Sequence, residues 1–334
     1  MIRSFLFAGI LSAALSQAAM INGAGSTFAE PIYSKWFSEY TKENKGSTFN
    51  YQGIGSGGGI RQMIAGTVDF AGTDAPLTKE ESDQAKKSVL HVPVALGAVV
   101  VSYNLPLQEP LQLTGPVIAD IFSGKITKWN APQIQELNKN IKLPDQAIAV
   151  ATRSDGSGTT AVFTDYLSKV SADWQSKAGK SVKWFPGSLG AKGNAGVAGL
   201  IKQAPGTIGY IELVYALENK IPFALVKNKS GQFVKADLGS VTASASGSLK
   251  DMMKAEYKLS ITDSATKGAY PISSFTWMLV FKEMGKEKGQ DIVKFAKWAM
   301  SDAAQKKAKE INYAEVPTDL RKEVLKSLEQ VKVQ

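Results

Sequence analysis

Three loops rich in glycine and hydroxyl side chains each lead into a helical pattern, and residues of these types could bind a small anion. The start of a helix exposes unpaired backbone N–H groups and the positive end of the helix dipole, which both favour an oxyanion. Glycine lets the backbone approach a ligand closely, and serine or threonine adds a directed donor. The three loops span residues 23–28, 53–59 and 153–159.

Each loop also has an ordinary structural interpretation. Serine and threonine are common N-caps and glycine is a common turn residue, so a single loop of this kind is most often only a helix start. Two features favour a shared ligand instead. There are three such loops, and the third carries Arg153, whose guanidinium can donate two hydrogen bonds to one oxyanion.

The second loop matches a different motif as well. Gly53, Gly55 and Gly58 have the spacing of the dinucleotide-binding fingerprint, follow a strand pattern, and have Asp74 downstream. A Rossmann oxidoreductase is therefore an open alternative. Against it, the motif begins well inside the chain, it leaves the other two loops without a role, and an exported protein is a poor setting for a diffusible nicotinamide cofactor.

Short apolar strand patterns alternate with helical patterns and would position these loops. Strands are expected at 48–52, 68–72, 89–101 and 147–152, with helical spacing around Ile60 and over 159–170. This alternation predicts an α/β protein with largely parallel sheets, and 334 residues divide more readily into two lobes than one. Residues 239–248 are small and polar, which predicts a mobile surface stretch.

The N-terminus has the pattern of a secretory signal. Arg3 precedes an apolar run over residues 5–15, and small residues follow up to Ala18, which predicts a signal peptide of residues 1–18. The run is shorter than the roughly 20 residues that span a bilayer. The chain contains no cysteine, which excludes disulfides and an N-terminal lipid anchor. We therefore expect a free periplasmic protein.

The charge is basic but dispersed. The formal net charge is +9, and loss of Arg3 with the signal would lower it to +8. Lysines alternate with acidic residues, as over 282–310, which is typical of a solvated helical surface. We expect no nucleic-acid binding, and the excess positive charge would instead steer small anions.

Catalysis has little support in the sequence. The single histidine, His91, lies in an apolar segment, so it is expected to be packed in or near the strands between the lobes and not to act as a base. The GxSxG nucleophile elbow and the Walker loop are absent from the sequence. We predict a binding protein and no enzyme, with a phosphatase as the weaker alternative.

Several motifs together resemble one family, the periplasmic phosphate-binding proteins of the phosphate-specific transport (Pst) system. The similarity covers nearly all of the chain after the signal and implies a two-lobe Venus-flytrap fold, type II-like, with mixed, largely parallel sheets and a cleft at the hinge. It implies one lobe from residues 19–94 plus 270–334 and another from 95–269. The motifs that carry it are at residues 23–28, 51–58, 68–76, 122–130, 153–159, 205–210 and 270–272.

The resemblance also implies a function and a site. It implies high-affinity binding of inorganic phosphate by a monomer without a cofactor, and delivery to an ABC importer made of two membrane permease subunits and an ATPase. In this family Asp155 would pair with and orient Arg153. Ser26 and Ser154 stand where the family often has alanine, which leaves backbone roles intact. The implied ligand-binding residues are Ser26, Thr27, Phe28, Ser56, Asp74, Arg153, Ser157, Gly158 and Thr159.

Asp74 is the candidate for selecting phosphate. Phosphate near neutral pH keeps at least one proton, which a carboxylate can accept, whereas sulfate keeps none and would meet only like charge. Arsenate is protonated too, so some cross-binding is expected. From local sequence alone, Asp74 could equally be an Asx-turn residue ahead of Pro76.

Overall fold

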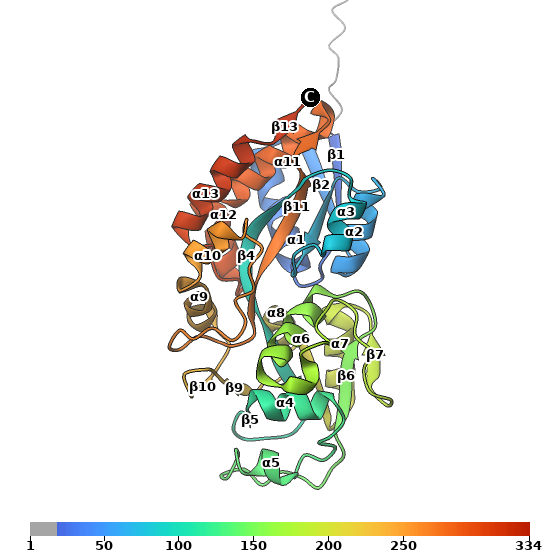
Figure 1. Ribbon diagram of the computed structural model, residues 1–334, viewed down its shortest axis with the longest axis vertical. Coiled ribbons are helices and arrows are strands. Elements are labelled where there is room, and N and C mark those ends of the chain that lie inside the picture. The colour runs from blue at the N-terminus through green and yellow to red at the C-terminus, as the bar shows by residue number, and fades with distance from the viewer. Residues whose placement is uncertain (1–18) are drawn as a thin grey trace, which may run out of the picture.

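One long strand, β4 (Val89–Tyr103), runs from one half of the molecule into the other, with β11 (Ser273–Phe281) paired beside it (Figure 1). The computed structural model describes residues 19–334, so the predicted signal peptide lies outside the described residues. Within 19–334, no helix combines the length and apolar character needed to cross a membrane. β4 is apolar almost throughout and buried at nearly every position, as expected for a strand covered on both faces.

Eight strands form one sheet in the order β2-β1-β3-β11-β4-β8-β6-β7. The pairs at both ends of this order are parallel, and the central pairs that involve β4 and β11 are antiparallel. This mixed α/β sheet confirms the predicted fold class. The remaining strands of the sheet are β1 (Ala19–Gly25), β2 (Ser47–Gly53), β3 (Phe70–Thr73), β6 (Ala149–Arg153), β7 (Leu189–Ala191) and β8 (Thr207–Glu212).

The first half packs helices from both ends of the chain around β1, β2 and β3. Apolar residues spaced three and four apart on α1 place Trp36, Phe37 and Tyr40 on one buried face. That face meets Phe295 of α11, with ring centroids 5.0 Å from Phe37 and 5.3 Å from Tyr40. The helices of this half are α1 (Glu30–Glu43), α2 (Ser56–Ile64), α3 (Lys79–Gln84), α11 (Lys286–Ala299), α12 (Asp302–Glu310) and α13 (Thr318–Glu329).

The second half packs helices around β6, β7 and β8. The helix predicted over 159–170 is α6 (Gly158–Val170), and its Phe163 stacks on Tyr210 of β8 with ring centroids 4.4 Å apart. The other elements of this half are β5 (Gln112–Leu113), α4 (Gly115–Phe122), α5 (Pro132–Gln135), η1 (Ala172–Trp174), α7 (Gly193–Gln203), α8 (Leu213–Glu218), β9 (Leu225–Lys227) and β10 (Phe233–Val234).

The prediction of a mobile stretch at 239–248 is wrong, because most of it is helix α9 (Leu238–Ser246). Asp237 and Ser240 form a reciprocal capping box at its start. Small side chains let the helix approach β4 and β11 closely, and Ser244 Oγ donates to the carbonyl of Tyr270 at 2.9 Å.

The chain then continues into α10 (Leu249–Lys254), which packs against α13. Strands β12 (Glu283–Met284) and β13 (Lys332–Val333) pair near the C-terminus. The lobe limits 19–94 plus 270–334 and 95–269 stay a prediction.

Candidate functional site

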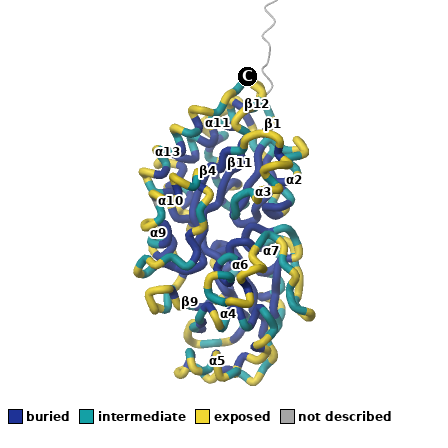
Figure 2. Tube along the Cα trace, viewed as in Figure 1, coloured by how far each residue is buried: buried dark blue, intermediate teal, exposed yellow. Residues whose placement is uncertain are grey.

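The sheet brings the three predicted loops together. Gly25, Gly53 and Gly72 lie in register near the carboxyl ends of three parallel strands, so the loops that follow β1, β2 and β3 begin side by side. In the second half, Arg153 at the end of β6 pairs with Ala191 of β7. Figure 1 shows these two edges directed toward each other across the junction between the halves, where the chain is largely buried (Figure 2). All nine predicted ligand-binding residues are buried there.

In the first half, the polar side chains of the candidate site surround Asp74, which lies just after β3. Its side chain is buried, and Ser26 Oγ donates to its two oxygens at 2.5 and 2.6 Å. Thr276 Oγ1, from β11, donates to Oδ1 at 2.8 Å. Ser56 Oγ accepts from the backbone N–H of Asp74 at 3.4 Å. Three separate segments therefore orient one carboxylate.

The environment of Asp74 favours its neutral form more than water does. Burial raises the pKa of Asp74 to about 6, even though the hydrogen bonds from Ser26 and Thr276 and the charge of Arg153 oppose the rise. At neutral pH the carboxylate remains mostly ionised and can accept a proton from a ligand. Near pH 6 it changes charge.

In the second half, the polar side chains of the candidate site surround Arg153. It is buried, and its Nε and Nη2 donate to Asp155 Oδ1 and Oδ2 at 2.7 and 2.5 Å, a bidentate pair. Its Nη1 donates to Thr159 Oγ1 at 3.3 Å. Burial alone would raise the pKa of Asp155, but the hydrogen bonds and charge of Arg153 outweigh it and keep the pKa below its usual value. The pair is therefore ionised.

The start of α6 lies directly against Asp74. Ser157 caps the helix, and its Oγ accepts from the backbone N–H of Thr160 at 3.0 Å. A Cβ on Gly158 would lie 2.4 Å from both Asp74 Oδ2 and Ser56 Oγ, so only glycine fits at this close approach. The two halves touch at this position.

The turn after β1 is held by tyrosines from distant parts of the chain. Tyr215 Oη donates to the carbonyl of Thr27 at 2.7 Å, and Tyr313 Oη donates to the carbonyl of Phe28 at 2.5 Å. These bonds fix the peptide groups, and hence the direction of the N–H groups, in this turn.

Five buried backbone N–H groups at the junction donate to no acceptor within residues 19–334. Buried N–H groups in proteins are nearly always paired, so a group of unpaired ones in one place indicates a ligand that accepts hydrogen bonds. The five come from three separate loops and both halves. They belong to Thr27, Phe28, Ser56, Gly158 and Thr159.

Two further contacts join the halves at the junction. The backbone N–H of Gly57 donates to the carbonyl of Gly156 at 2.9 Å. Lys180 Nζ donates to the carbonyl of Pro76 at 3.1 Å and to Glu81 Oε2 at 2.7 Å. The backbone carbonyl of Lys180 also accepts from the N–H of Ser157, so this lysine contacts both the loop before α6 and the opposite half.

Two residues of the site were not predicted from the sequence. Asn194, at the start of α7, is buried and contacts both Thr27 and Thr159. Its signal was present, because 190–194 is another glycine-containing loop that leads into a helix. Thr276 reaches Asp74 from a strand 202 positions away in the sequence, and no local pattern indicates that contact.

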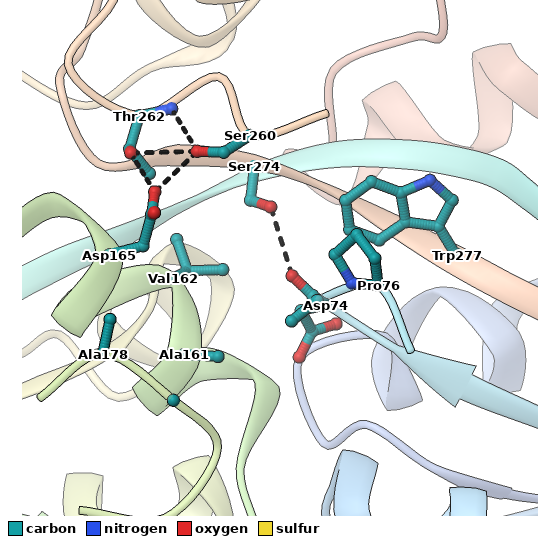
Figure 3. Close-up of a pocket in the computed structure, with 12 residues that line it drawn as sticks. Asp74, Pro76, Ala161, Val162, Asp165, Ala178, Ser260, Thr262, Ser274 and Trp277 are labelled. Atoms are coloured by element: carbon teal, nitrogen blue, oxygen red, sulfur yellow. Dashed lines mark hydrogen bonds between the residues drawn. The ribbon is translucent and has the colours of Figure 1, made fainter. Parts of the chain in front are cut away.

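A cavity of about 210 Å³ lies beside the site, between α6 and β11 (Figure 3). Pro76 and Trp277 line it from one side and Ala161 and Val162 from the other. The backbone carbonyl of Asp74 accepts a hydrogen bond from Ser274 Oγ at 3.4 Å, and the Asp74 carboxylate points in another direction, away from Ser274 (Figure 3). None of the residues that line this cavity is a lysine or an arginine, so it is not where the anion-binding groups converge.

His91 is packed in β4, as predicted. It is 2% exposed, and its Nε2 accepts from the backbone N–H of Leu77 at 3.1 Å. Burial, and next the charges of Lys258 and Lys180, lower its pKa to about 3. The imidazole is neutral at physiological pH. Within the described residues, no cluster of three or more histidine or acidic side chains could hold a metal ion.

Comparison with known proteins identifies the family. The model of the PBP superfamily domain matches residues 12–303. The chain is 43% identical over 319 residues to the phosphate-binding protein PstS of Xylella fastidiosa, covering 94% of this chain and 86% of that one. It is 42% identical to the PstS of Haemophilus influenzae, covering 91% of each.

Solved structures show the same fold at low sequence identity. A phosphate ABC transporter substrate-binding protein from Clostridium perfringens with bound phosphate has a TM-score of 0.65 at 19% identity, covering 89% of this chain and all of that one. A phosphate-binding protein from Stenotrophomonas maltophilia has a TM-score of 0.70 at 18% identity, covering 93% and 94%. With these relatives over most of its length, the chain belongs to the PBP superfamily and, within it, to the PstS family.

Proposed function

We propose that this protein binds inorganic phosphate at the junction between its halves and serves an ABC phosphate importer. The observation that carries the proposal is the group of five unpaired, buried N–H groups, from both halves, next to Arg153 and Asp74. The relatives above are named as phosphate-binding proteins, and their sequences match nearly the whole chain.

The donors suit a small, multiply charged oxyanion. Backbone N–H groups at helix starts are oriented before the ligand arrives, so binding costs little reorganisation. Each hydrogen bond to a charged group contributes about 1.5–3 kcal/mol. Several such bonds, less the cost of association, are consistent with micromolar or tighter binding. Because Arg153 is already paired with Asp155, most of the affinity would come from neutral donors.

Asp74 would provide the preference for phosphate over sulfate. Its oxygens accept from Ser26 and Thr276, and Gly158 at the start of α6 lies against Oδ2. A ligand held by the donors of α6 would therefore meet this carboxylate. A protonated phosphate oxygen can donate to it, whereas sulfate brings only negative charge.

The proposal also covers the partners of the protein and its location in the cell. We expect a monomer that is exported to the periplasm by a signal peptide, residues 1–18, which is then cleaved, and that delivers phosphate to two permease subunits and an ATPase. Contacts across the junction, such as Lys180 with Glu81, support a receptor that closes over its ligand. Because the relatives are named as binding proteins, and His91 is buried and neutral, we propose no reaction at the site.

Titration calorimetry of the protein, stripped of anions by unfolding and refolding, tests the proposal. Phosphate should bind at micromolar concentration or tighter, and sulfate at least a hundredfold more weakly. Asp69→Asn provides a matched control, because Asp69 pairs with Lys288 away from the junction. Failure of the wild-type protein to bind phosphate would refute the proposal, and equal affinity for sulfate would refute the role of Asp74.

A further inference from the structure

Asn194 lies between two threonines of the site, one from each half. It is fully buried at the start of α7. Its Oδ1 accepts from the backbone N–H of Glu212 at 3.0 Å, which fixes the orientation of the amide. Its Nδ2 therefore faces the threonines and donates to Thr27 Oγ1 at 3.0 Å and to Thr159 Oγ1 at 3.1 Å.

These bonds determine what the two hydroxyl groups can do. A threonine hydroxyl has two acceptor lone pairs and one proton. Thr27 Oγ1 accepts from both the Nδ2 and the backbone N–H of Asn194, the latter at 3.1 Å. Thr159 Oγ1 accepts from Asn194 and from Arg153 Nη1. Both acceptor capacities are filled, so each hydroxyl can only donate, and neither proton has an acceptor within the described chain.

We propose that Asn194 is a positioning residue that forces Thr27 and Thr159 to act as hydrogen-bond donors toward the bound anion. This rests on the proposed phosphate function. Under it, the two threonines bind only unprotonated ligand oxygens, and Asp74 receives the ligand proton. Asn194 need not touch the ligand, because it acts by fixing the two threonine hydroxyl groups as hydrogen-bond donors.

A merely structural role is the alternative, since Asn194 also joins the start of α7 to β8 through Glu212. Two substitutions separate the roles. In Asn194→Ala the hydroxyls lose a donor but can still rotate and donate to the anion. In Asn194→Asp the shape and the bond from Glu212 are retained, but the carboxylate accepts the two hydroxyl protons and withdraws them from the ligand.

The two roles predict opposite orders of phosphate affinity for Asn194→Ala and Asn194→Asp, which calorimetry can measure. We expect Asn194→Ala to weaken phosphate binding about tenfold and Asn194→Asp at least about a hundredfold, because each bond to a charged group is worth about ten- to a hundredfold. A structural role predicts that alanine, which leaves the Glu212 N–H without a partner, is the more damaging change. Equal losses, or a larger loss in Asn194→Ala, would overturn the proposal.

The new negative charge in Asn194→Asp would also repel an anion, and a double-mutant cycle removes that effect. Thr27→Val deletes the hydroxyl while it keeps the side-chain shape. If the aspartate acts through the hydroxyl, its effect should be at least tenfold smaller in the Thr27→Val background, whereas simple repulsion would be the same in both. Additive losses would overturn the proposal.

Asn104, which follows β4, offers a matched control because its side chain contacts the same helix. Its Nδ2 donates to the carbonyls of Ile201 and Lys202 at the other end of α7, away from the threonines. Asn104→Ala and Asn104→Asp should leave phosphate affinity within about twofold of wild type. If the wild-type protein itself binds no phosphate, the proposed function fails. If it binds and the aspartate and alanine variants rank the wrong way, only the role of Asn194 fails.

Discussion

The two halves contribute opposite chemistry to one site. The first half provides Asp74, a carboxylate held by hydroxyl groups, with a pKa raised to about 6 by burial. The second half provides Arg153, a cation already joined to Asp155 by two hydrogen bonds. The cation is therefore neutralised before a ligand arrives, whereas the carboxylate is not. Under the proposed function, this difference predicts that affinity depends on oriented donors in both halves and that discrimination among anions depends on the first half.

Arg153→Ala should produce the largest loss of phosphate affinity, on the order of a thousandfold. Removing one partner of a buried ion pair costs about 3–5 kcal/mol because the other charge stays behind. Here the remaining charge, Asp155, would also repel the ligand. Calorimetry with Arg153→Ala and with the double variant Arg153→Ala/Asp155→Asn checks this. The double variant should regain part of the loss, and a double variant as weak as the single one would contradict the argument.

Asp74→Ala should reduce phosphate affinity by about ten- to a hundredfold and raise sulfate affinity. The variant loses one acceptor for the ligand proton and also removes a negative charge, so the two anions should respond in opposite directions. Competition titrations with both anions measure the ratio of the two affinities. Unchanged selectivity in this variant would mean that the first half does not discriminate.

The contrast between Asp74 in the first half and Asp155 in the second should also appear in how the stability of the protein depends on pH. Asp74 has a pKa of about 6 in the folded protein and about 3.8 as its ordinary value, so the folded state binds more protons in that interval. Its contribution to stability is fully present below about pH 4 and is lost as the pH rises through 6, by on the order of 3 kcal/mol. Asp155, whose pKa is lowered, contributes with the opposite sign.

Denaturant unfolding of wild type and Asp74→Asn in anion-free buffer between pH 4 and pH 8 isolates this contribution. The difference in unfolding free energy should grow in favour of Asp74→Asn as the pH rises through 6. Asp155→Asn serves as the comparison, and it should lose stability relative to wild type at neutral pH. A constant difference between wild type and Asp74→Asn would show that the carboxylate does not titrate there.

Much of this arrangement could be predicted from sequence because it is local. Strand ends followed by glycine and a hydroxyl side chain indicated the loops at 23–28, 53–59 and 153–159, and helical spacing indicated α6. The convergence of the first two loops could be expected once parallel strands were inferred, since the carboxyl ends of β1 and β2 share an edge. The third loop follows β6, which reaches the junction from the opposite half. The individual ligand contacts implied by the family resemblance stay a proposal.

What could not be predicted depends on residues far apart in the sequence. Thr276 reaches Asp74 from β11, and Tyr313 reaches the Phe28 carbonyl from near the C-terminus. The stretch 239–248 was misjudged because serine and glycine are common in loops. Its helix is stabilised by the capping box at Asp237 and by packing against β4 and β11, neither of which composition alone reveals.

The smallest expected effect tests how the halves are held together. Lys180 Nζ bonds to Glu81 at 2.7 Å across the junction, and both side chains are partly exposed. An ion pair at the edge of the junction contributes on the order of 1 kcal/mol, so Lys180→Met should speed phosphate release two- to fivefold while leaving the carbonyl that accepts from Ser157 in place. Stopped-flow dissociation at low and high salt measures this.

Lys177→Met is the matched control for that measurement. Lys177 lies three residues away and contacts the ring of Trp174 within the second half, so its loss should leave the release rate unchanged. Because salt screens exposed charges, the difference between Lys180→Met and wild type should shrink as ionic strength rises. A Lys180→Met rate equal to wild type at low salt would show that the bond contributes nothing to closure, and that other contacts across the junction, such as those of Gly57, Asn194 and Tyr215, hold the halves together.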